Sequence, residues 1–159
     1  MNLWQTYFRT QQPVPSFPIL RVICSERVFG SQYEHHGRFR QGERQAVFKY
    51  TLQGEGRFRD ASGEHRVPAG SGFLVEIRDP ATSYYYPKDG TEPWTFVWIA
   101  FMGEHCMQQV RDIVARYGAV FSIPEQGPIM RRFLEFRRDD GRHVTVTAAQ
   151  GAEMSPACS

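Results

Sequence analysis

Two adjacent histidines, His35 and His36, followed by Glu43, come nearest in type and spacing to a metal-ligand set. A metal site in a small β barrel needs imidazoles that converge on one point and partners that orient them. Adjacent residues on a strand point to opposite faces, so His35 and His36 diverge if they lie on one. The aromatic segment at 83–86 supplies no histidine to replace either of them. We therefore expect no metal and no other cofactor.

The sequence also lacks a recognisable catalytic motif. Neither Ser71 nor Ser83 lies in a G-x-S-x-G motif, which places a nucleophile on a sharp strand-to-helix turn. The turn Gly54-Glu55-Gly56 lacks the Lys-Ser/Thr pair of a phosphate-binding loop. We therefore expect that the protein is not an enzyme.

Aromatic residues, by contrast, are dense at positions predicted to lie on strands. A buried Tyr or Trp needs a partner for its polar end, so a barrel lined with several of them suits a polar ligand that stacks on a ring. An arginine at a strand edge adds hydrogen-bond donors for a sugar or an anion. Ordinary core packing is the alternative for part of this set. The candidate ligand-binding residues are Arg38 or Arg40, together with Phe48, Tyr50, Tyr84, Tyr85, Tyr86, Phe96 and Trp98.

Between residues 19 and 103 the chain consists of short predicted β-strands separated by turns, which indicates a mainly β domain. Turn signals recur about every 8 to 12 residues, as is typical of a sandwich or barrel. One strand alternates cleanly, with Phe48 and Tyr50 on one face and Lys49 on the other. Residues 94–101 are apolar at nearly every position, as expected where both faces of a strand are covered.

After Gly103 the hydrophobic period becomes that of amphipathic helices. Helices are expected up to Tyr117, over 128–138 and over 144–154. The apolar stripe of the second helix favours either packing on the barrel or dimerisation. Its candidate dimer-interface residues are Ile129, Met130, Phe133, Leu134 and Phe136. The expected organisation is an extended, proline-containing arm (1–18), a barrel (19–103) and a helical dimerisation segment (104–159).

Charge and hydropathy narrow the protein class further. The 19 basic and 17 acidic residues leave a formal net charge of +2, too little for the electrostatic footprint of a nucleic-acid binder. No run approaches the roughly 18 to 20 apolar residues that span a bilayer. Residues 1–6 have neither the basic nor the apolar region of a signal peptide. We expect a single cytoplasmic domain with no membrane partner.

Three blocks of sequence carry a family resemblance: Tyr50-Thr51-Leu52-Gln53-Gly54-Glu55-Gly56, Val67-Pro68-Ala69-Gly70, and Pro93-Trp94-Thr95-Phe96-Val97-Trp98-Ile99-Ala100-Phe101-Met102-Gly103. Together, and in their spacing, they resemble the N-terminal effector domain of AraC/XylS-family transcriptional regulators. The resemblance extends over roughly residues 19–140. It implies a cupin-like double-stranded β-helix, a jelly-roll barrel that binds an effector inside, followed by amphipathic helices that dimerise.

The resemblance also implies roles for individual residues. The family's N-terminal arm can fold over the bound effector, and residues 1–18 resemble such an arm. The effector-binding positions fall on Arg38 or Arg40, on Phe96 and Trp98, and on Tyr85, with Tyr84 or Tyr86 one register step away.

Two departures from the family pattern matter. The chain has Ala81-Thr82-Ser83-Tyr84 where many members have Pro-His-x-Tyr, so we expect no effector contact from a histidine there. The family's pair of helix-turn-helix motifs does not lie in this sequence, so DNA contact is expected only through a missing C-terminal domain. The leading hypothesis is a dimeric sensor of a sugar or another polar metabolite. The alternatives are a cupin-fold metalloenzyme, such as an isomerase or dioxygenase, and a stand-alone sugar-binding cupin.

Overall fold

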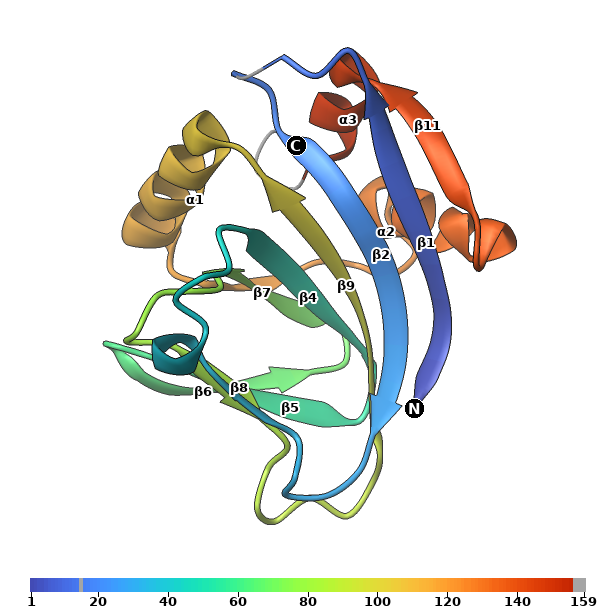
Figure 1. Cartoon of the computed structure of the whole chain (residues 1–159). Coiled ribbons are helices and arrows are strands. Elements are labelled where there is room, and N and C mark those ends of the chain that lie inside the picture. Colours follow the sequence, from blue (N-terminus) through green and yellow to red (C-terminus); the bar gives the residue numbers. More distant parts are fainter. Residues whose placement is uncertain (15, 156–159) are drawn as a thin grey trace.

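The computed structural model of the chain describes residues 1–14 and 16–155. Strands dominate these residues, and the α-helices follow Gly103 (Figure 1). The elements in chain order are β1 (Asn2–Gln11), β2 (Ile19–Val28), β3 (Glu34–His36), the 3₁₀-helix η1 (Gly37–Phe39), β4 (Ala46–Gln53), β5 (Glu55–Asp60), β6 (Gly63–Pro68), β7 (Ser71–Glu76), β8 (Ser83–Tyr85), β9 (Trp94–Met102), α1 (Glu104–Tyr117), β10 (Val120–Ser122), α2 (Pro128–Leu134), the 3₁₀-helix η2 (Glu135–Asp139), β11 (His143–Thr147) and α3 (Ala148–Met154).

The strands form two sheets that face each other across an aromatic core (Figure 1). Sheet A has seven strands in the order β10-β7-β4-β9-β2-β1-β11, and sheet B has four in the order β3-β8-β5-β6. Phe58 of sheet B stacks on Phe73 of sheet A, with ring centres 4.6 Å apart. The protein is therefore mainly β, a cupin-like jelly-roll barrel followed by C-terminal helices, and the predicted fold class is confirmed.

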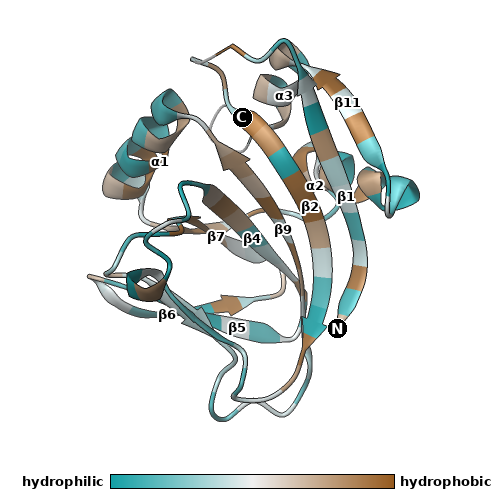
Figure 2. Ribbon diagram, in the orientation of Figure 1, coloured by the Kyte–Doolittle hydropathy of each residue, from teal (hydrophilic) through white to brown (hydrophobic). Residues whose placement is uncertain are grey.

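The three α-helices in the described part of the chain pack on the face of sheet A that points away from sheet B. Cys106 of α1, Met130 of α2 and Met154 of α3 share one buried core with Ile99 of β9. Figure 2 shows apolar stretches along β2, β4 and β9, which have this helical layer on one side and sheet B on the other. Coverage on both faces explains why residues 94–101 are apolar almost throughout. None of these helices is long and apolar enough to cross a membrane.

The apolar stripe of the second helix packs within the chain. Met130 is 0% exposed and Phe133 is 2% exposed. Leu134 and Phe136, which continues the stripe into η2, pack against the same core. Ile129 is the member of the predicted dimer interface that stays at the surface, with 37% exposure. Four of the five residues therefore pack on the chain's own sheet, as the alternative predicted, and a dimer through this helix stays a prediction.

Residues 1–18 contain a ten-residue strand where a free arm was expected. β1 pairs antiparallel with β2 and parallel with β11, so it is an inner strand of sheet A. Trp4, Thr6 and Phe8 alternate along it and are buried, and the Thr6 hydroxyl donates to the Phe136 carbonyl at 2.7 Å. The expectation of an arm that folds over a ligand is corrected, since this segment already has partners on both sides.

The helix predicted over 144–154 begins later than expected. Its first four residues belong to β11, whose β-branched residues favour a strand and pair with β1. Thr147 then caps α3, because its hydroxyl accepts from the Gln150 N–H while the Gln150 side chain accepts from the Thr147 N–H. The end of the predicted segment 104–159, from residue 156, lies outside the described residues.

Candidate functional site

A cluster of polar side chains lies between the two sheets around Lys49. Alternate residues of β2, β4 and β9 point from sheet A toward sheet B. The strand register places Cys24 beside Trp98 and Trp98 beside Lys49, so these residues form one row across the sheet. Glu26 and Phe96 belong to the next row. We call this region around Lys49 the inner site.

Lys49 is only 3% exposed and is surrounded by aromatic rings. Its Nζ lies 3.9 Å from the centre of the Phe96 ring and 4.5 Å from that of Tyr84. The centres of the Tyr33 and Trp94 rings lie at 5.1 and 5.8 Å, and the Tyr33 hydroxyl hydrogen-bonds Nζ. Ring faces attract a cation without neutralising it. No carboxylate within residues 1–14 and 16–155 forms an ion pair with Lys49.

The protonation of Lys49 reflects this burial. Its pKa falls from the ordinary 10.5 to about 7, chiefly because burial removes water from the ammonium group. The charge of Glu26 opposes this change and that of Arg40 adds to it. Burial also raises the pKa of the Tyr33 hydroxyl far above its usual range. At neutral pH, Lys49 is therefore divided between the charged and the neutral amine.

Trp94 is held rigidly at the inner site. Its ring is fully buried, and its Nε1 donates to the Thr51 hydroxyl at 2.9 Å. That hydroxyl in turn donates to the Val67 carbonyl at 2.9 Å. A Cβ on Gly56 would lie 2.1 Å from Cζ2 of the ring, so only glycine lets β5 pass this close. The ring position is therefore fixed by hydrogen bonds and by backbone contact.

Arg40 borders the inner site from the segment after η1. Its Nη1 donates to the Tyr84 hydroxyl at 2.9 Å and lies 3.5 Å from Nδ1 of His35, while Nη2 donates to Glu43 at 3.0 Å. The hydrogen bond from Arg40 holds the pKa of Glu43 below its usual range. Burial, reinforced by the charges of Lys49 and Arg40, lowers the pKa of His35 to about 4. At pH 7 the arginine is therefore charged and the imidazole beside it is neutral.

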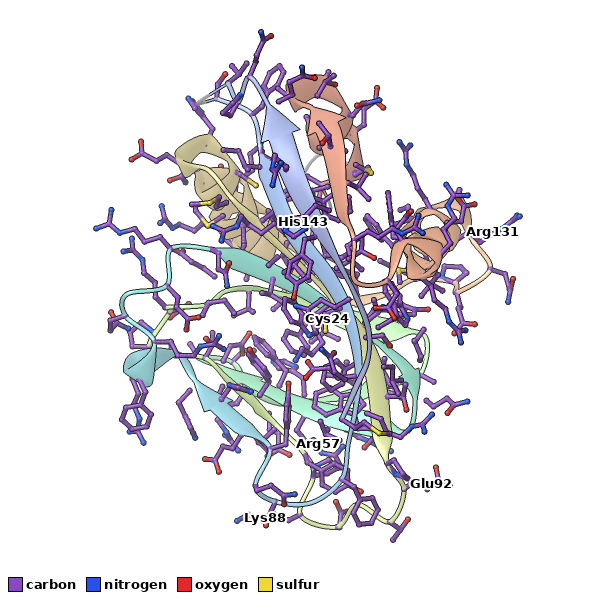
Figure 3. All side chains as sticks on the ribbon, turned by 45° about the vertical axis from the view of Figure 1, so that its right-hand side comes forward. Cys24, Arg57, Lys88, Glu92, Arg131 and His143 are labelled. Atoms are coloured by element: carbon purple, nitrogen blue, oxygen red, sulfur yellow. The ribbon has the colours of Figure 1, made fainter. Side chains whose placement is uncertain are left out.

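Glu26 and Cys24 face the inner site from β2. Trp98 donates from Nε1 to Glu26 at 2.6 Å. Cys24 donates to the Asn2 side-chain oxygen at 2.9 Å, and burial raises the pKa of its thiol to about 12. Figure 3 shows Cys24 among the crowded side chains at the centre of the molecule. The thiol stays protonated, which makes it a poor nucleophile.

The two histidines diverge as predicted for neighbours on a strand. His35 packs against the rings of Tyr33 and Tyr84 inside the barrel, while His36 lies on the outer face beside Glu34. Within the described ranges, no group of three or more His, Cys, Asp or Glu side chains could hold a metal ion. The charged groups nearest His35 include Arg40 and Lys49, whose charges repel a cation.

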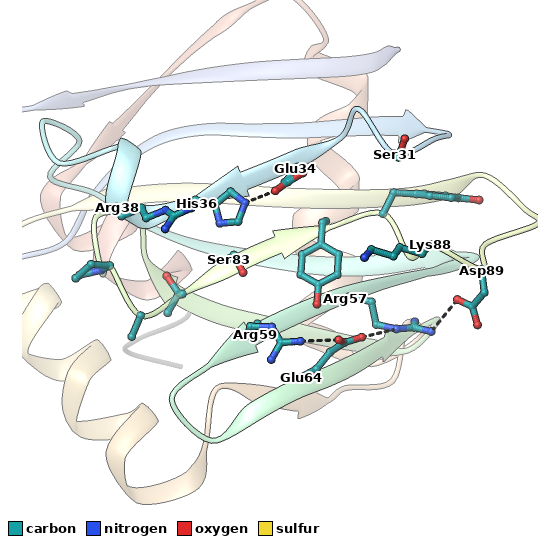
Figure 4. Close-up of a pocket in the computed structure, with 15 residues that line it drawn as sticks. Ser31, Glu34, His36, Arg38, Arg57, Arg59, Glu64, Ser83, Lys88 and Asp89 are labelled. Atoms are coloured by element: carbon teal, nitrogen blue, oxygen red, sulfur yellow. Dashed lines mark hydrogen bonds and ion pairs between the residues drawn. The ribbon is translucent and has the colours of Figure 1, made fainter.

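A groove of about 650 Å³ lies on the outer face of sheet B (Figure 4). Arg57 contacts Glu64 at 3.3 Å and Asp89 at 3.5 Å, and Arg59 contacts Glu64 at 2.8 Å. These charges compensate one another within the chain. Arg38 and Lys88 also line this groove at its exposed rim, so its charges face solvent, unlike the buried amine of the inner site.

The predicted ligand-binding residues lie in three places: the inner site, the outer groove and the core beneath the helices. Arg40, Phe96 and Trp98 lie in the inner site. Arg38 and Tyr85 line the outer groove instead. Of the pair Arg38 and Arg40, Arg40 is the one that borders the inner site.

Tyr84 takes the inward position that the resemblance placed on Tyr85. Its hydroxyl meets Arg40 and its ring faces Lys49. Because successive residues of a strand alternate between faces, an error of one position moves a side chain to the other face. The assignment to Tyr85 is corrected for this reason.

Phe48 and Tyr50 point away from sheet B, into the core beneath the helices. The Tyr50 hydroxyl hydrogen-bonds the Ile123 carbonyl on that side. Their assignment to the ligand site is therefore corrected. Because side chains alternate between the two faces of a strand, Lys49, which lies between Phe48 and Tyr50, points into the barrel.

Sequence reasoning missed Lys49, Tyr33, His35 and Glu26 as members of the site. A signal existed for Lys49, which lies between aromatic residues on a strand that pairs with a nearly fully apolar one. His35 lies in a three-residue strand and Tyr33 lies just before it, and such a strand is too short to show a hydrophobic period. Glu26 joins the site only through the pairing of β2 with β9.

Comparison with known proteins gives one family match. A family model described as an AraC-like ligand binding domain matches residues 24–143. No curated protein matches the chain.

Several solved structures are similar at low identity. The protein YhaK from Escherichia coli has 17% identity and a TM-score of 0.45, over 65% of this chain and 45% of that chain. The bacterial pirin YhhW from Escherichia coli, in complex with nickel(II), has 23% identity and a TM-score of 0.42, over 64% of this chain and 44% of that one. A predicted oxalate decarboxylase from Thermotoga maritima has 19% identity and a TM-score of 0.39, over 52% of this chain and 67% of that one. The chain thus matches less than half the length of YhaK and of YhhW.

Proposed function

Because the chain belongs to the family of AraC-like ligand binding domains, we propose that it senses a polar small molecule bound between its two sheets. The observation that carries this proposal is the buried Lys49 amine among aromatic rings, with the partly exposed Arg40 and Glu26 beside it. An apolar core would stabilise the barrel better, because burying charged groups costs free energy. Perturbed, buried titratable groups of this kind are typical of functional sites.

The effector class in this proposal is a sugar or another polar metabolite. Phe96 and Trp98 offer ring faces for stacking, and Arg40 offers hydrogen-bond donors at the edge of the same site. Such a combination of rings and a few polar groups is what orients a small ligand in a concave site.

The regulatory part of the proposal concerns the intact protein. We infer a cytoplasmic transcription regulator that dimerises and contacts DNA through a C-terminal domain. A ligand changes such a regulator only if it binds one arrangement more tightly than another, which shifts the population toward that arrangement. Sedimentation of this chain with and without effector tests the dimer, and a monomer at tens of micromolar under both conditions would contradict it.

A thermal-shift screen over sugars and polar metabolites tests ligand sensing. A ligand present at 100 times its Kd adds about 2.7 kcal/mol of stability, which corresponds to a rise in Tm of about 5 to 10 °C for a chain of this size. Trp98→Ala should abolish the rise, whereas Tyr117→Ala, at a position 66% exposed on α1, should leave it intact. An equal rise in wild type and Trp98→Ala would place the ligand elsewhere.

The alternative class, a cupin-fold metalloenzyme, is tested by elemental analysis of protein purified without chelator. We propose that the chain is a sensor rather than an enzyme, and about one iron, manganese or nickel per chain would contradict this. A stand-alone sugar-binding cupin would bind effector and have no DNA partner, so the gene sequence following the codon for residue 159 distinguishes it from a regulator.

A further inference from the structure

We propose that the effector is an organic anion whose carboxylate binds Lys49 in place of the Tyr33 hydroxyl. This inference rests on the proposed function, because it names the chemical class of the ligand that the inner site would take.

Lys49 forms no ion pair with a carboxylate in the part of the chain that the structure describes. Lys49 is almost fully buried, and its described partners are one hydroxyl and four ring faces. A buried charge is stabilised when an opposite charge with good hydrogen-bond geometry accompanies it. A carboxylate on Nζ supplies that charge, and charge-assisted hydrogen bonds of this type are roughly twice as strong as neutral ones.

Such a ligand would also need space beside Lys49. Tyr33 is half-buried and belongs to the segment between β2 and β3, where its carbonyl accepts one hydrogen bond from the Tyr86 N–H at 3.1 Å. Its ring meets Trp94 edge-on at 5.7 Å and Phe96 at 5.6 Å. If the Tyr33 side chain rotates outward, it vacates a slot the size of a phenol, walled by rings and ending at the Lys49 ammonium. The slot fits a small carboxylate with a flat or slender apolar body.

The charges around this slot also bear on the ligand class. Glu26 and Cys24 face Lys49 from β2, His35 from β3, Tyr84 from β8, and Arg40 from the segment after η1. Arg40 has a charge partner in Glu43, whereas Glu26 accepts a hydrogen bond from the neutral Trp98 indole and keeps its negative charge, which favours the charged form of Lys49. His35 is neutral at pH 7 because its pKa is about 4. Among the cations of the inner site, Lys49 is therefore the one without an ion pair in the described part of the chain, and a ligand carboxylate would bind on the side of the Tyr33 hydroxyl.

A carboxylate bound to Lys49 would favour the charged amine and raise its pKa. Since the pKa in the free protein is about 7, most Lys49 is neutral at pH 8, and binding should take up about one proton. The affinity should accordingly fall by about tenfold per pH unit above pH 8 and be nearly constant between about pH 5.5 and pH 6, where the ligand's carboxylate is still ionised. Calorimetry in buffers of different ionisation enthalpy measures the proton uptake directly.

The binding experiment pairs carboxylates with uncharged analogues of the same shape. Benzoate and hexanoate are titrated against benzamide and hexanamide at pH 7, with the tryptophan fluorescence as the readout. We expect each carboxylate to bind at least tenfold more tightly than its amide. Lys49→Met should remove this difference, and Lys49→Gln serves as a second variant if the first fails to fold. Lys88→Met, at the other lysine of the chain, exposed in the loop after β8, is the matched control and should change nothing.

Tyr33→Phe gives an independent test of displacement. It removes the hydroxyl that competes for Lys49 and keeps the ring, so carboxylate affinity should rise by several-fold. Equal binding of acid and amide, or acid binding unchanged in both Lys49 variants, would overturn the proposal. If neutral sugars stabilise the protein through Trp98 and carboxylates do not, the ligand class is wrong while the sensing function stands. If neither kind of molecule binds, both are wrong.

Discussion

The burial of Lys49 predicts a pH dependence of stability with a definite sign. Its pKa is about 7 in the folded protein, against 10.5 in water, and each tenfold change in protonation corresponds to about 1.4 kcal/mol. Holding the charged amine in the barrel therefore costs about 5 kcal/mol. Below pH 7 both states are protonated, and the folded state bears the whole cost. Between pH 7 and pH 10.5 the unfolded chain binds more protons, so stability from this group rises with pH.

Lys49→Met tests this reasoning because it fills the same space without a charge. The folded-state pKa already includes whatever the four ring contacts contribute to holding the charged amine. We therefore expect the variant to be more stable at pH 6 by about 4 to 5 kcal/mol. The gain should shrink toward zero by about pH 10, where the wild-type amine is neutral in the folded state.

The assay has two parts. Urea unfolding at pH 6, 8 and 10 gives the free energy of unfolding of the wild type and of Lys49→Met, with Lys88→Met as the control. Because Lys49 and Lys88 are the only lysines in the sequence, ¹³C-lysine NMR yields one titration for each of them. A Lys49 signal that titrates above pH 10, or a variant that is less stable by the same amount at every pH, would refute the reasoning.

Three further predictions concern the packing around the site. Gly56→Ala should lower the free energy of unfolding by about 1 to 3 kcal/mol in urea, because its Cβ meets the fixed Trp94 ring at 2.1 Å. Phe133→Ala should lower the free energy of unfolding by about 3 to 5 kcal/mol and leave the sedimentation coefficient unchanged, because the side chain is buried in its own chain. A change in oligomeric state with no loss of stability would instead support the dimer interface. Deletion of residues 1–11 should abolish cooperative unfolding in circular dichroism, because it removes β1 from between β2 and β11; a stable, folded deletion would mean that the segment is an accessory arm.

The sequence was most informative where a pattern is local. The alternation around Phe48 and the change of period after Gly103 predicted a strand and a helix that the structure contains. Gly118, expected to end that helix, follows it with a φ of +87°, a conformation that favours glycine. These features depend on side-chain spacing over a few residues.

The errors arose where a structure depends on distant parts of the chain. β1 is a stable inner strand because β11, more than 130 residues away, pairs with one of its edges, as in the pair Tyr7 and His143. No local period could reveal that neighbour. The reversed assignment of Phe48 and Lys49 has a related cause: both faces of β4 are buried, so hydrophobicity alone did not identify the face toward sheet B.

β4 also connects the inner site to the helical layer. Lys49 points into the barrel, while its two neighbours, Phe48 and Tyr50, pack beneath the helices. Tyr50 hydrogen-bonds the carbonyl of Ile123, only a few residues before α2 begins at Pro128. A ligand that changes the position or charge of Lys49 therefore acts on a strand that touches both layers. Coupling requires an element with two arrangements that both sites bias, and β4 is the strand in which to look for one, because it contributes side chains to both layers. The sensing proposed for this chain would then act without a mobile N-terminal arm, because β1 pairs within sheet A.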